Sequence, residues 1–137
     1  MAILHSVAAG TILRCDYSRG GFQEPEMVKP RPAIVVSPRL PHRDRLCNVV
    51  PISGTYAGRE LAYVVRLEFD PPLPEPFSYS VAWAKCDMLA TVSFERLDMF
   101  RTKRDHTGKR KYLNRKLNSE DFVRVREGIR RALGWAA

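Results

Sequence analysis

The sequence has little of what marks membrane, secreted or metal-binding proteins. No apolar run approaches the ~18 residues that a membrane-spanning helix needs. The N-terminal segment lacks the basic start of a secretory signal, because its first arginine is Arg14. Only three cysteines occur, Cys15, Cys47 and Cys86, and they form no Cys-x-x-Cys pair, which disfavours a zinc site or a disulfide framework. We therefore expect a cytoplasmic protein with no metal, no cofactor and no membrane association.

Catalytic signatures are equally scarce. The sequence contains no G-x-G-x-x-G, no Walker A motif, no H-E-x-x-H and no G-x-S-x-G. Its three histidines, His5, His42 and His106, lie far apart in the chain, so each is predicted to be a surface or structural residue. These absences disfavour an enzyme that acts on a small molecule through a bound cofactor.

Positive charge is abundant, and it is concentrated in one part of the chain. Residues 1–95 hold ten Lys and Arg against ten Asp and Glu, whereas residues 96–137 hold thirteen against five and account for the net charge of +8. Within residues 101–116, eight basic side chains are opposed only by Asp105. A localised basic stripe indicates a polyanionic partner, most simply nucleic acid, although a solvated loop is the alternative. The candidate phosphate-binding residues in this stripe are Lys109, Arg110 and Lys111.

The first two thirds of the chain have the patterns of short strands. They are predicted at 11–17, 33–37, 47–53, 62–69, 80–87 and 88–100. The clearest is 62–69, where Val65 and Leu67 alternate with Arg66 and Glu68. Turn-forming glycines and prolines separate the strands and no helical pattern intervenes, so we predict a small, mostly antiparallel sheet or barrel.

The last twenty residues change to a helical period. Asn118 or Ser119 can cap the start of a helix, and apolar residues follow at a spacing of three or four. This apolar stripe consists of Phe122, Val125, Ile129 and Leu133. We predict an amphipathic helix over about 119–134 that packs one face on the sheet, and a single domain over residues 1–137.

Polar side chains occur at three places where a strand protein does not need them. Arg31 precedes a strand that is predicted to be buried, and its guanidinium fits a phosphate, although an ion pair at a strand end is the alternative. Ser53 stands where a strand runs into a glycine-containing loop, which favours a turn serine, although its hydroxyl could orient a group of the substrate. On a strand over 80–87, Trp83, Lys85 and Asp87 would share one face and could act on a stacked nucleotide, or the charges could form an exposed pair.

Six elements of the sequence follow one another in a recognisable order. They are Gly10-Thr11-Ile12, a polar loop with Gly21 and Glu24, Arg31-Pro32-Ala33-Ile34-Val35-Val36-Ser37, Val49-Val50-Pro51-Ile52-Ser53, Lys85-Cys86-Asp87 and Thr91-Val92-Ser93-Phe94-Glu95-Arg96-Leu97. In this order, and with a helix after them, residues 9 to 134 resemble the MazF/PemK/Kid family of type II toxin–antitoxin toxins. The resemblance implies an SH3-like barrel that forms a homodimer, cleaves single-stranded RNA without metal and is silenced by a cognate antitoxin.

The resemblance also implies roles for individual residues. Arg31 matches the arginine at the scissile phosphate, and Ser53 stands where the family usually has threonine. Lys85 and Asp87 match the acid and the base of the Kid branch, with lysine in place of arginine. The list of expected substrate-binding residues outside the basic stripe is Glu24, Lys29 and Trp83. The loop histidine of Kid-like members is missing, because Phe22 and Gln23 occupy that place.

These residues are sufficient for a reaction in which RNA is cut by its own 2′-hydroxyl. Asp87 would accept the proton of the 2′-OH, Lys85 would protonate the leaving 5′-oxygen, and Arg31 would stabilise the charged transition state. The products would be a 2′,3′-cyclic phosphate and a 5′-hydroxyl. The alternative is a barrel without catalysis, either an inhibitor of gyrase like CcdB or a degenerate nuclease that only binds RNA.

Overall fold

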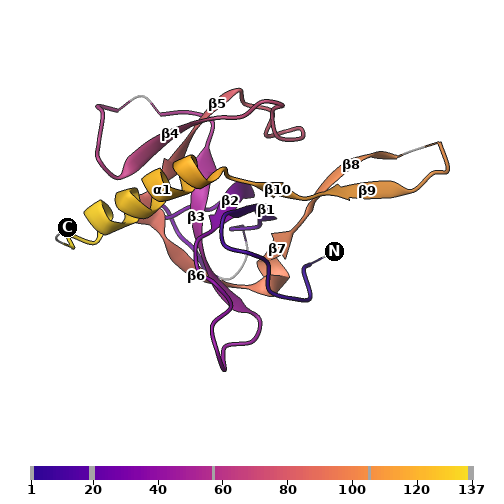
Figure 1. The fold of residues 1–137 in the computed structure, drawn as a ribbon, viewed down its shortest axis with the longest axis horizontal. Coiled ribbons are helices and arrows are strands. Elements are labelled where there is room, and N and C mark those ends of the chain that lie inside the picture. Colours follow the sequence, from indigo (N-terminus) through magenta and orange to yellow (C-terminus); the bar gives the residue numbers. More distant parts are fainter. Residues whose placement is uncertain (1, 19–20, 57, 105, 136–137) are drawn as a thin grey trace.

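The computed structural model describes residues 2–18, 21–56, 58–104 and 106–135, and it is built mainly of β-strands (Figure 1). The strands are β1 (Thr11–Cys15), β2 (Arg31–Val35), β3 (Leu46–Ser53), β4 (Val64–Glu68), β5 (Val81–Lys85), β6 (Ala90–Ser93), β7 (Leu97–Asp98), β8 (Phe100–Arg104), β9 (Arg110–Leu113) and β10 (Arg115–Lys116). The helices are the 3-10 turns η1 (Cys86–Met88) and η2 (Phe94–Arg96) and the α-helix α1 (Ser119–Ala132).

The main sheet has eight strands, and the paired strands run antiparallel. Its order is β10-β1-β2-β3-β5-β4, with β6 added to β3 and β7 added to β1. The long strand β3 pairs with β6 through its first half and with β5 through its last two residues, so it joins two parts of a bent sheet. The predicted mostly antiparallel fold with a C-terminal helix is confirmed; within the described residues the pairing does not close into a ring.

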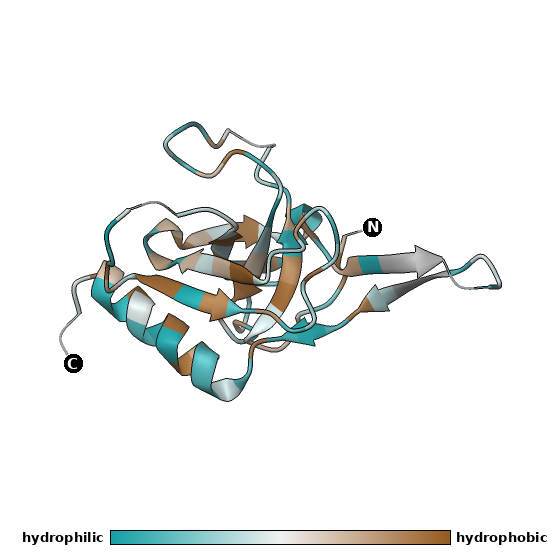
Figure 2. Ribbon diagram, turned by 90° about the horizontal axis from the view of Figure 1, so that it is seen from above, coloured by the Kyte–Doolittle hydropathy of each residue, from teal (hydrophilic) through white to brown (hydrophobic). Residues whose placement is uncertain are grey.

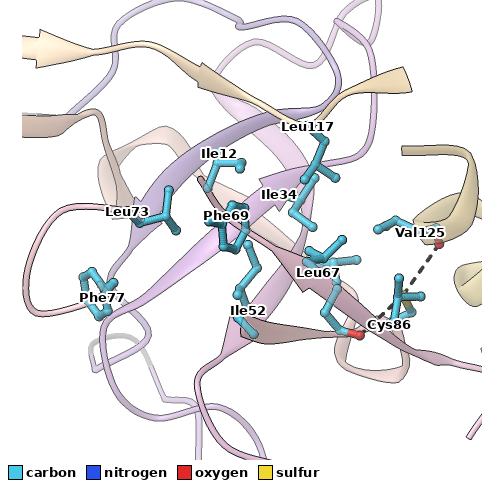
Figure 3. Packing of buried hydrophobic residues seen from close by; sticks show 14 of the residues in the cluster. Ile12, Ile34, Ile52, Leu67, Phe69, Leu73, Phe77, Cys86, Leu117 and Val125 are labelled. Carbon is cyan, nitrogen blue, oxygen red and sulfur yellow. Dashed lines mark hydrogen bonds between the residues drawn. The ribbon is translucent and has the colours of Figure 1, made fainter. Parts of the chain in front are cut away.

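Strand β2 is buried on both faces, as its run of apolar residues predicts. Ile34 points into the helix-side core, which lies under α1 and includes Ile52 and Val125 (Figure 3). Ala33 and Val35 point into the opposite core. In β4 the predicted alternation is confirmed, because Val65 and Leu67 are buried while their polar neighbours are exposed. The strand is shorter than predicted, however, and begins only at Val64.

Helix α1 begins where the sequence predicts. The side chain of Asn118 accepts a hydrogen bond from the backbone of Asp121 (2.7 Å), which satisfies a free N–H of the first turn. Val125 is buried, and Phe122 and Ile129 pack against the helix-side core, so α1 presents an apolar stripe to the sheet (Figure 2). Leu133 does not belong to this stripe. It is 46% exposed, because the helix ends one residue before it.

A close approach through Gly128 positions α1 on the sheet. A Cβ at this position would lie 2.7 Å from the Cys86 sulfur and 3.1 Å from Val65 Cγ2. Cys86 also places its thiol 3.6 Å from the carbonyl oxygen of Val125 (Figure 3). The helix thus rests directly on η1, the turn that follows β5.

We expect Gly128→Ala to destabilise the protein. Overpacking a dense core costs ~1–3 kcal/mol, and the better helix propensity of alanine returns up to about 1 kcal/mol of this. A Cβ only 2.7 Å from the Cys86 sulfur places the cost in the upper part of this range, so the net loss in the free energy of unfolding, measured by urea denaturation, should be about 1–2 kcal/mol. Adding Cys86→Ala removes the sulfur that the new methyl group meets, so the loss from Gly128→Ala should shrink in that background. A single variant as stable as the wild type would contradict the close packing.

The basic stripe within residues 101–116 lies largely in a hairpin of β8 and β9, called the arm below, which the sequence pattern did not predict. Strands β8 and β9 pair as a hairpin that extends away from the body of the molecule (Figure 1), with Arg101 opposite Tyr112. At its base, Phe100 packs edge-on against Phe77, with ring centroids 6.3 Å apart. Tyr112 is half exposed, with the Arg101 guanidinium 6.0 Å from its ring centroid. The sequence pattern did not predict the hairpin because residues 101–111 contain no hydrophobic residue, so no alternation of apolar and polar residues marks its strands.

The cysteines behave as core residues. All three are free and buried, and burial raises the pKa of Cys15 and Cys86 to about 12 and that of Cys47 to about 11. These thiols are therefore neutral near pH 7, which does not suit a nucleophile or a metal ligand. Among the described residues, no group of three or more potential ligands is placed to hold a metal ion. The helices in this part of the chain are also too short or too polar to cross a membrane.

Candidate active site

Three strand ends meet at one edge of the sheet. Strand β2 begins at Arg31, β3 ends at Ser53 and β5 ends at Lys85. Ala33 lies opposite Pro51 in the antiparallel β2–β3 pair. Arg31 is two residues before Ala33 and Ser53 is two residues after Pro51, so the two side chains point to the same face of the sheet. The antiparallel pairing of β3 with β5 brings Lys85 to this edge as well.

A cavity of about 610 Å³ opens at this edge. The loop before β2 covers one side of it, and the strand ends and the turn η1 form the other. Its lining residues are Glu24, Pro25, Glu26, Met27, Val28, Lys29, Arg31, Ser53, Thr55, Lys85 and Met88. Five of the residues that the sequence singled out, far apart along the chain, are therefore brought together; they are Glu24, Lys29, Arg31, Ser53 and Lys85.

Arg31 is the side chain in this cavity that most clearly requires a ligand. It is half-buried, and its Nε lies out of contact with solvent without a hydrogen-bond partner. An unpaired buried donor on a cation is costly unless an anion supplies the acceptor. Lys85 is half-buried and Lys29 is exposed, so two further cations line the same space. The cavity is therefore suited to a phosphate group.

Ser53 lines the cavity but uses its hydroxyl locally. Its Oγ donates to the carbonyl oxygen of Thr55 (3.0 Å) and accepts from the backbone N–H of Thr55 (3.3 Å). These bonds hold the turn after β3, as the turn interpretation of the sequence expects. Tyr79 packs directly over Gly54, where a side chain would collide with its ring. The turn thus presents Thr55, a residue that the sequence reading missed although it lies two positions after Ser53.

Lys85 and Asp87 do not line the same cavity, which corrects the geometry expected from the sequence. Strand β5 ends at Lys85, and Asp87 belongs to the 3-10 turn η1, so the strand alternation does not reach it. The turn forms because Cys86 is buried beneath α1 and its backbone N–H donates to the carbonyl oxygen of Tyr63 (3.0 Å). Asp87 lines a neighbouring cavity instead, and Met88 lines both.

As far as the structure describes them, two other predicted groups do not line the cavity. Trp83 is half-buried and packs against Tyr56, with ring centroids 6.3 Å apart, and it does not line the cavity. Lys109 is exposed in the arm. Arg110 and Lys111 lie in β9, and their side chains are outside the described part of the structure. None of the described arm residues lines the cavity.

The loop before β2 is anchored to the body by its aromatic residue. Phe22, which stands where the resemblance to Kid-like members would place a histidine, packs edge-on against Tyr17 at 5.6 Å between ring centroids. The guanidinium of Arg96 lies 4.9 Å from the centroid of the Phe22 ring. Further along the loop, the carboxylate of Glu26 accepts a hydrogen bond from the backbone N–H of Gln23 (3.3 Å). Glu24 is exposed and makes no hydrogen bond or ion pair with the described residues.

Comparison with known proteins agrees with the fold described above and identifies the family. The chain is 28% identical to the uncharacterized protein YifN of Escherichia coli strain K12, over 94% of this chain and 93% of that protein. Its fold is similar to that of a mycobacterial endoribonuclease in complex with its cognate antitoxin (TM-score 0.62, 18% identity, 96% and 99% of the two chains). It is also similar to MazF from Deinococcus radiodurans (TM-score 0.58, 16% identity, 93% and 96%). Residues 8–133 match the model of the PemK-like, MazF-like toxins of type II toxin–antitoxin systems, and the chain belongs to that family.

Proposed function

We propose that this toxin is an endoribonuclease that cuts single-stranded RNA without a metal ion and thereby inhibits growth. The observation that most directly supports this proposal is the buried Nε of Arg31, which has no hydrogen-bond partner among the described residues. It lies in a cavity that Lys29 and Lys85 also line. Such a cavity suits the scissile phosphate of an RNA strand, because the fork of a guanidinium and the nearby ammonium groups bind phosphate oxygens. Membership of the toxin family and the likeness of its fold to endoribonucleases support this proposal.

The reaction needs a proton acceptor, a proton donor and a cation that stabilises negative charge on the phosphate. The 2′-oxygen attacks the adjacent phosphorus as its proton leaves, and the bond from phosphorus to the 5′-oxygen breaks. Arg31 stabilises the extra negative charge on the phosphoryl oxygens, and Lys85 gives a proton to the leaving 5′-oxygen. The products are a 2′,3′-cyclic phosphate and a 5′-hydroxyl end, so no further reactant is consumed until the cyclic phosphate hydrolyses.

We assign the proton acceptor to Glu24 in place of Asp87. Glu24 lines the cavity that holds Arg31 and Lys85, whereas Asp87 lines the neighbouring one. Glu26 also lines the cavity, but its carboxylate is engaged by the backbone of Gln23. Ser53 acts indirectly, because its hydrogen bonds to Thr55 shape the turn that faces the phosphate.

The partners of this toxin follow from the same family. A cognate antitoxin is proposed because the similar mycobacterial endoribonuclease forms a complex with one. We also propose the homodimer that the resemblance implies and the cytoplasmic location that the cysteine content and the N-terminal segment led us to expect. A second subunit would extend the open cavity into a longer groove along the RNA strand.

Cleavage should continue when divalent metal ions are removed. The chain has no metal-ligand motif, and the proposed chemistry uses only its own side chains. Incubation with a long single-stranded RNA in excess chelator is expected to give discrete fragments with 5′-hydroxyl ends. Activity that chelation abolishes and Mg²⁺ restores would refute the mechanism. Binding of RNA without any cleavage would instead identify the protein as a degenerate, non-catalytic binder.

We further propose that the basic arm makes sequence-independent contacts with phosphates. Neutralising Lys109, Arg110 and Lys111 together should weaken the binding of different single-stranded RNAs about equally. At ~0.7 per phosphate contact, the log–log dependence of affinity on salt should become shallower by about two units. The single-turnover rate at saturating RNA should barely change, because none of the described side chains of the arm lines the cavity. An unchanged salt dependence would show that the arm does not contact the RNA.

A further inference from the structure

A second cavity, of about 310 Å³, adjoins the candidate active site. Pro25, Glu26, Met27 and Met88 line both cavities and therefore form the wall between them. Ligand pockets span about 300–1,000 Å³, so the second cavity is at the small end of this range and has room for one flat ring system. A ring bound there would be attached to a phosphate in the first cavity.

Most of the residues that line the second cavity are apolar, and one of its aromatic rings is held in place. Phe22 and Met27 belong to the loop before β2 and pack against the opposite core, while Leu89 lies on the other side, after η1. Phe22 is fixed between Tyr17 and Arg96 by the ring contacts described above. Side chains of this kind give a base a surface for stacking, and the base does not have to order them first.

One carboxylate in this cavity is unengaged by the rest of the described chain. Asp87 is exposed at the cavity and makes no hydrogen bond or ion pair with the described residues. The other carboxylate, that of Glu26, is engaged by the backbone of Gln23. A carboxylate accepts hydrogen bonds and cannot donate any, so its partner must present donors.

We propose that the second cavity binds a guanine base next to the scissile phosphate, with the Asp87 carboxylate accepting hydrogen bonds from guanine N1–H and N2–H. This inference rests on the proposed function, since it takes single-stranded RNA to be the substrate. Guanine has two adjacent donors on its Watson–Crick edge, which match the two oxygens of a carboxylate. Adenine and cytosine present one amino group beside an acceptor, and uracil presents one N–H between two acceptors, so each leaves a carboxylate oxygen facing an acceptor.

Binding to an RNA analogue that cannot be cut tests the proposal directly. The probes are short 2′-O-methyl uridine oligonucleotides with one central guanine, adenine, cytosine or inosine, and the readout is fluorescence anisotropy. A bidentate contact discriminates between bases by about tenfold or more, so the guanine probe should bind the wild-type protein at least tenfold more tightly than the adenine or cytosine probe. Inosine lacks the N2 amino group and should fall between them.

Substitutions then test whether the preference for guanine depends on Asp87. Asp87→Asn should abolish the guanine preference, because an amide group offers only one acceptor atom. Glu120→Gln, which removes an equal charge from an exposed position of helix α1, is the matched control and should retain the preference. Equal affinity of the wild-type protein for the four bases, or a guanine preference that survives Asp87→Asn, would overturn the inference.

The two proposals fail in different ways. If RNA is cleaved but the analogues show no guanine preference, the base-binding cavity is wrong and the nuclease proposal stands. If the analogues show the preference and its loss in Asp87→Asn, but no RNA is cleaved, the cavity is right and the nuclease proposal is wrong.

Discussion

Replacing Arg31 by alanine should lower the rate of RNA cleavage by about 10²–10³-fold, the usual effect of removing one donor that stabilises charge in a transition state. The side chain is a half-buried cation of the cavity, and its buried Nε has no hydrogen-bond partner among the described residues. The fold should survive, because a group that is unsatisfied in the free protein contributes little to its stability. Single-turnover cleavage of a defined RNA, with a thermal unfolding curve of each variant, measures both effects.

Two further variants make this result specific. Arg31→Lys keeps the positive charge but loses the planar fork of donors, so it should recover only part of the lost rate. Arg59→Ala removes an exposed arginine that does not line the cavity, and should cleave at the wild-type rate. Cleavage by Arg31→Ala close to the wild-type rate would mean that the phosphate is bound elsewhere.

Replacing Glu24 by glutamine should lower kcat by about 10²–10⁴-fold, the contribution typical of general acid–base catalysis. The amide has nearly the shape of the carboxylate but cannot accept the proton of the 2′-hydroxyl. Because the change acts on the chemical step, KM should move far less than kcat. Steady-state kinetics on one single-stranded RNA separates the two parameters.

The controls for Glu24→Gln are substitutions of two other carboxylates that do not line the cavity of Arg31, and kcat is compared among the three variants. Glu120→Gln lies on helix α1 outside both cavities, and should leave kcat unchanged. The decisive comparison is with Asp87→Asn. If Asp87→Asn lowers kcat by 10² or more on every RNA and Glu24→Gln does not, the proton acceptor is Asp87, as the family resemblance implies, and the assignment to Glu24 is wrong.

Much of the fold could be predicted because local patterns decide it. The alternation of Val65 and Leu67 with charged residues marks β4, and the apolar run after Arg31 marks a strand buried on both faces. Asn118 and the spacing of the apolar residues after it mark α1. The boundaries were less exact. β5 ends two residues early, since the burial of Cys86 under a distant helix, and not the local pattern, ends the strand.

The candidate site could be predicted only in part. Arg31, Ser53 and Lys85 were expected, and all three line the cavity. Thr55 and Met88 were not expected: Met88 reaches the cavity because η1 turns the chain back.

The sequence alone determined the family, the antiparallel β-fold, the C-terminal helix and most of the basic and acidic residues from which a site can be built. These features depend on composition, on the spacing of apolar residues and on the order of short motifs. All three can be read from residues that are close together in the sequence. Tertiary structure decided which charges share a cavity. It placed Glu24 near Arg31 and moved Asp87 to an adjoining cavity. The physical reason is that strand alternation fixes a side chain's direction only while the strand continues, and packing between distant segments decides where it stops.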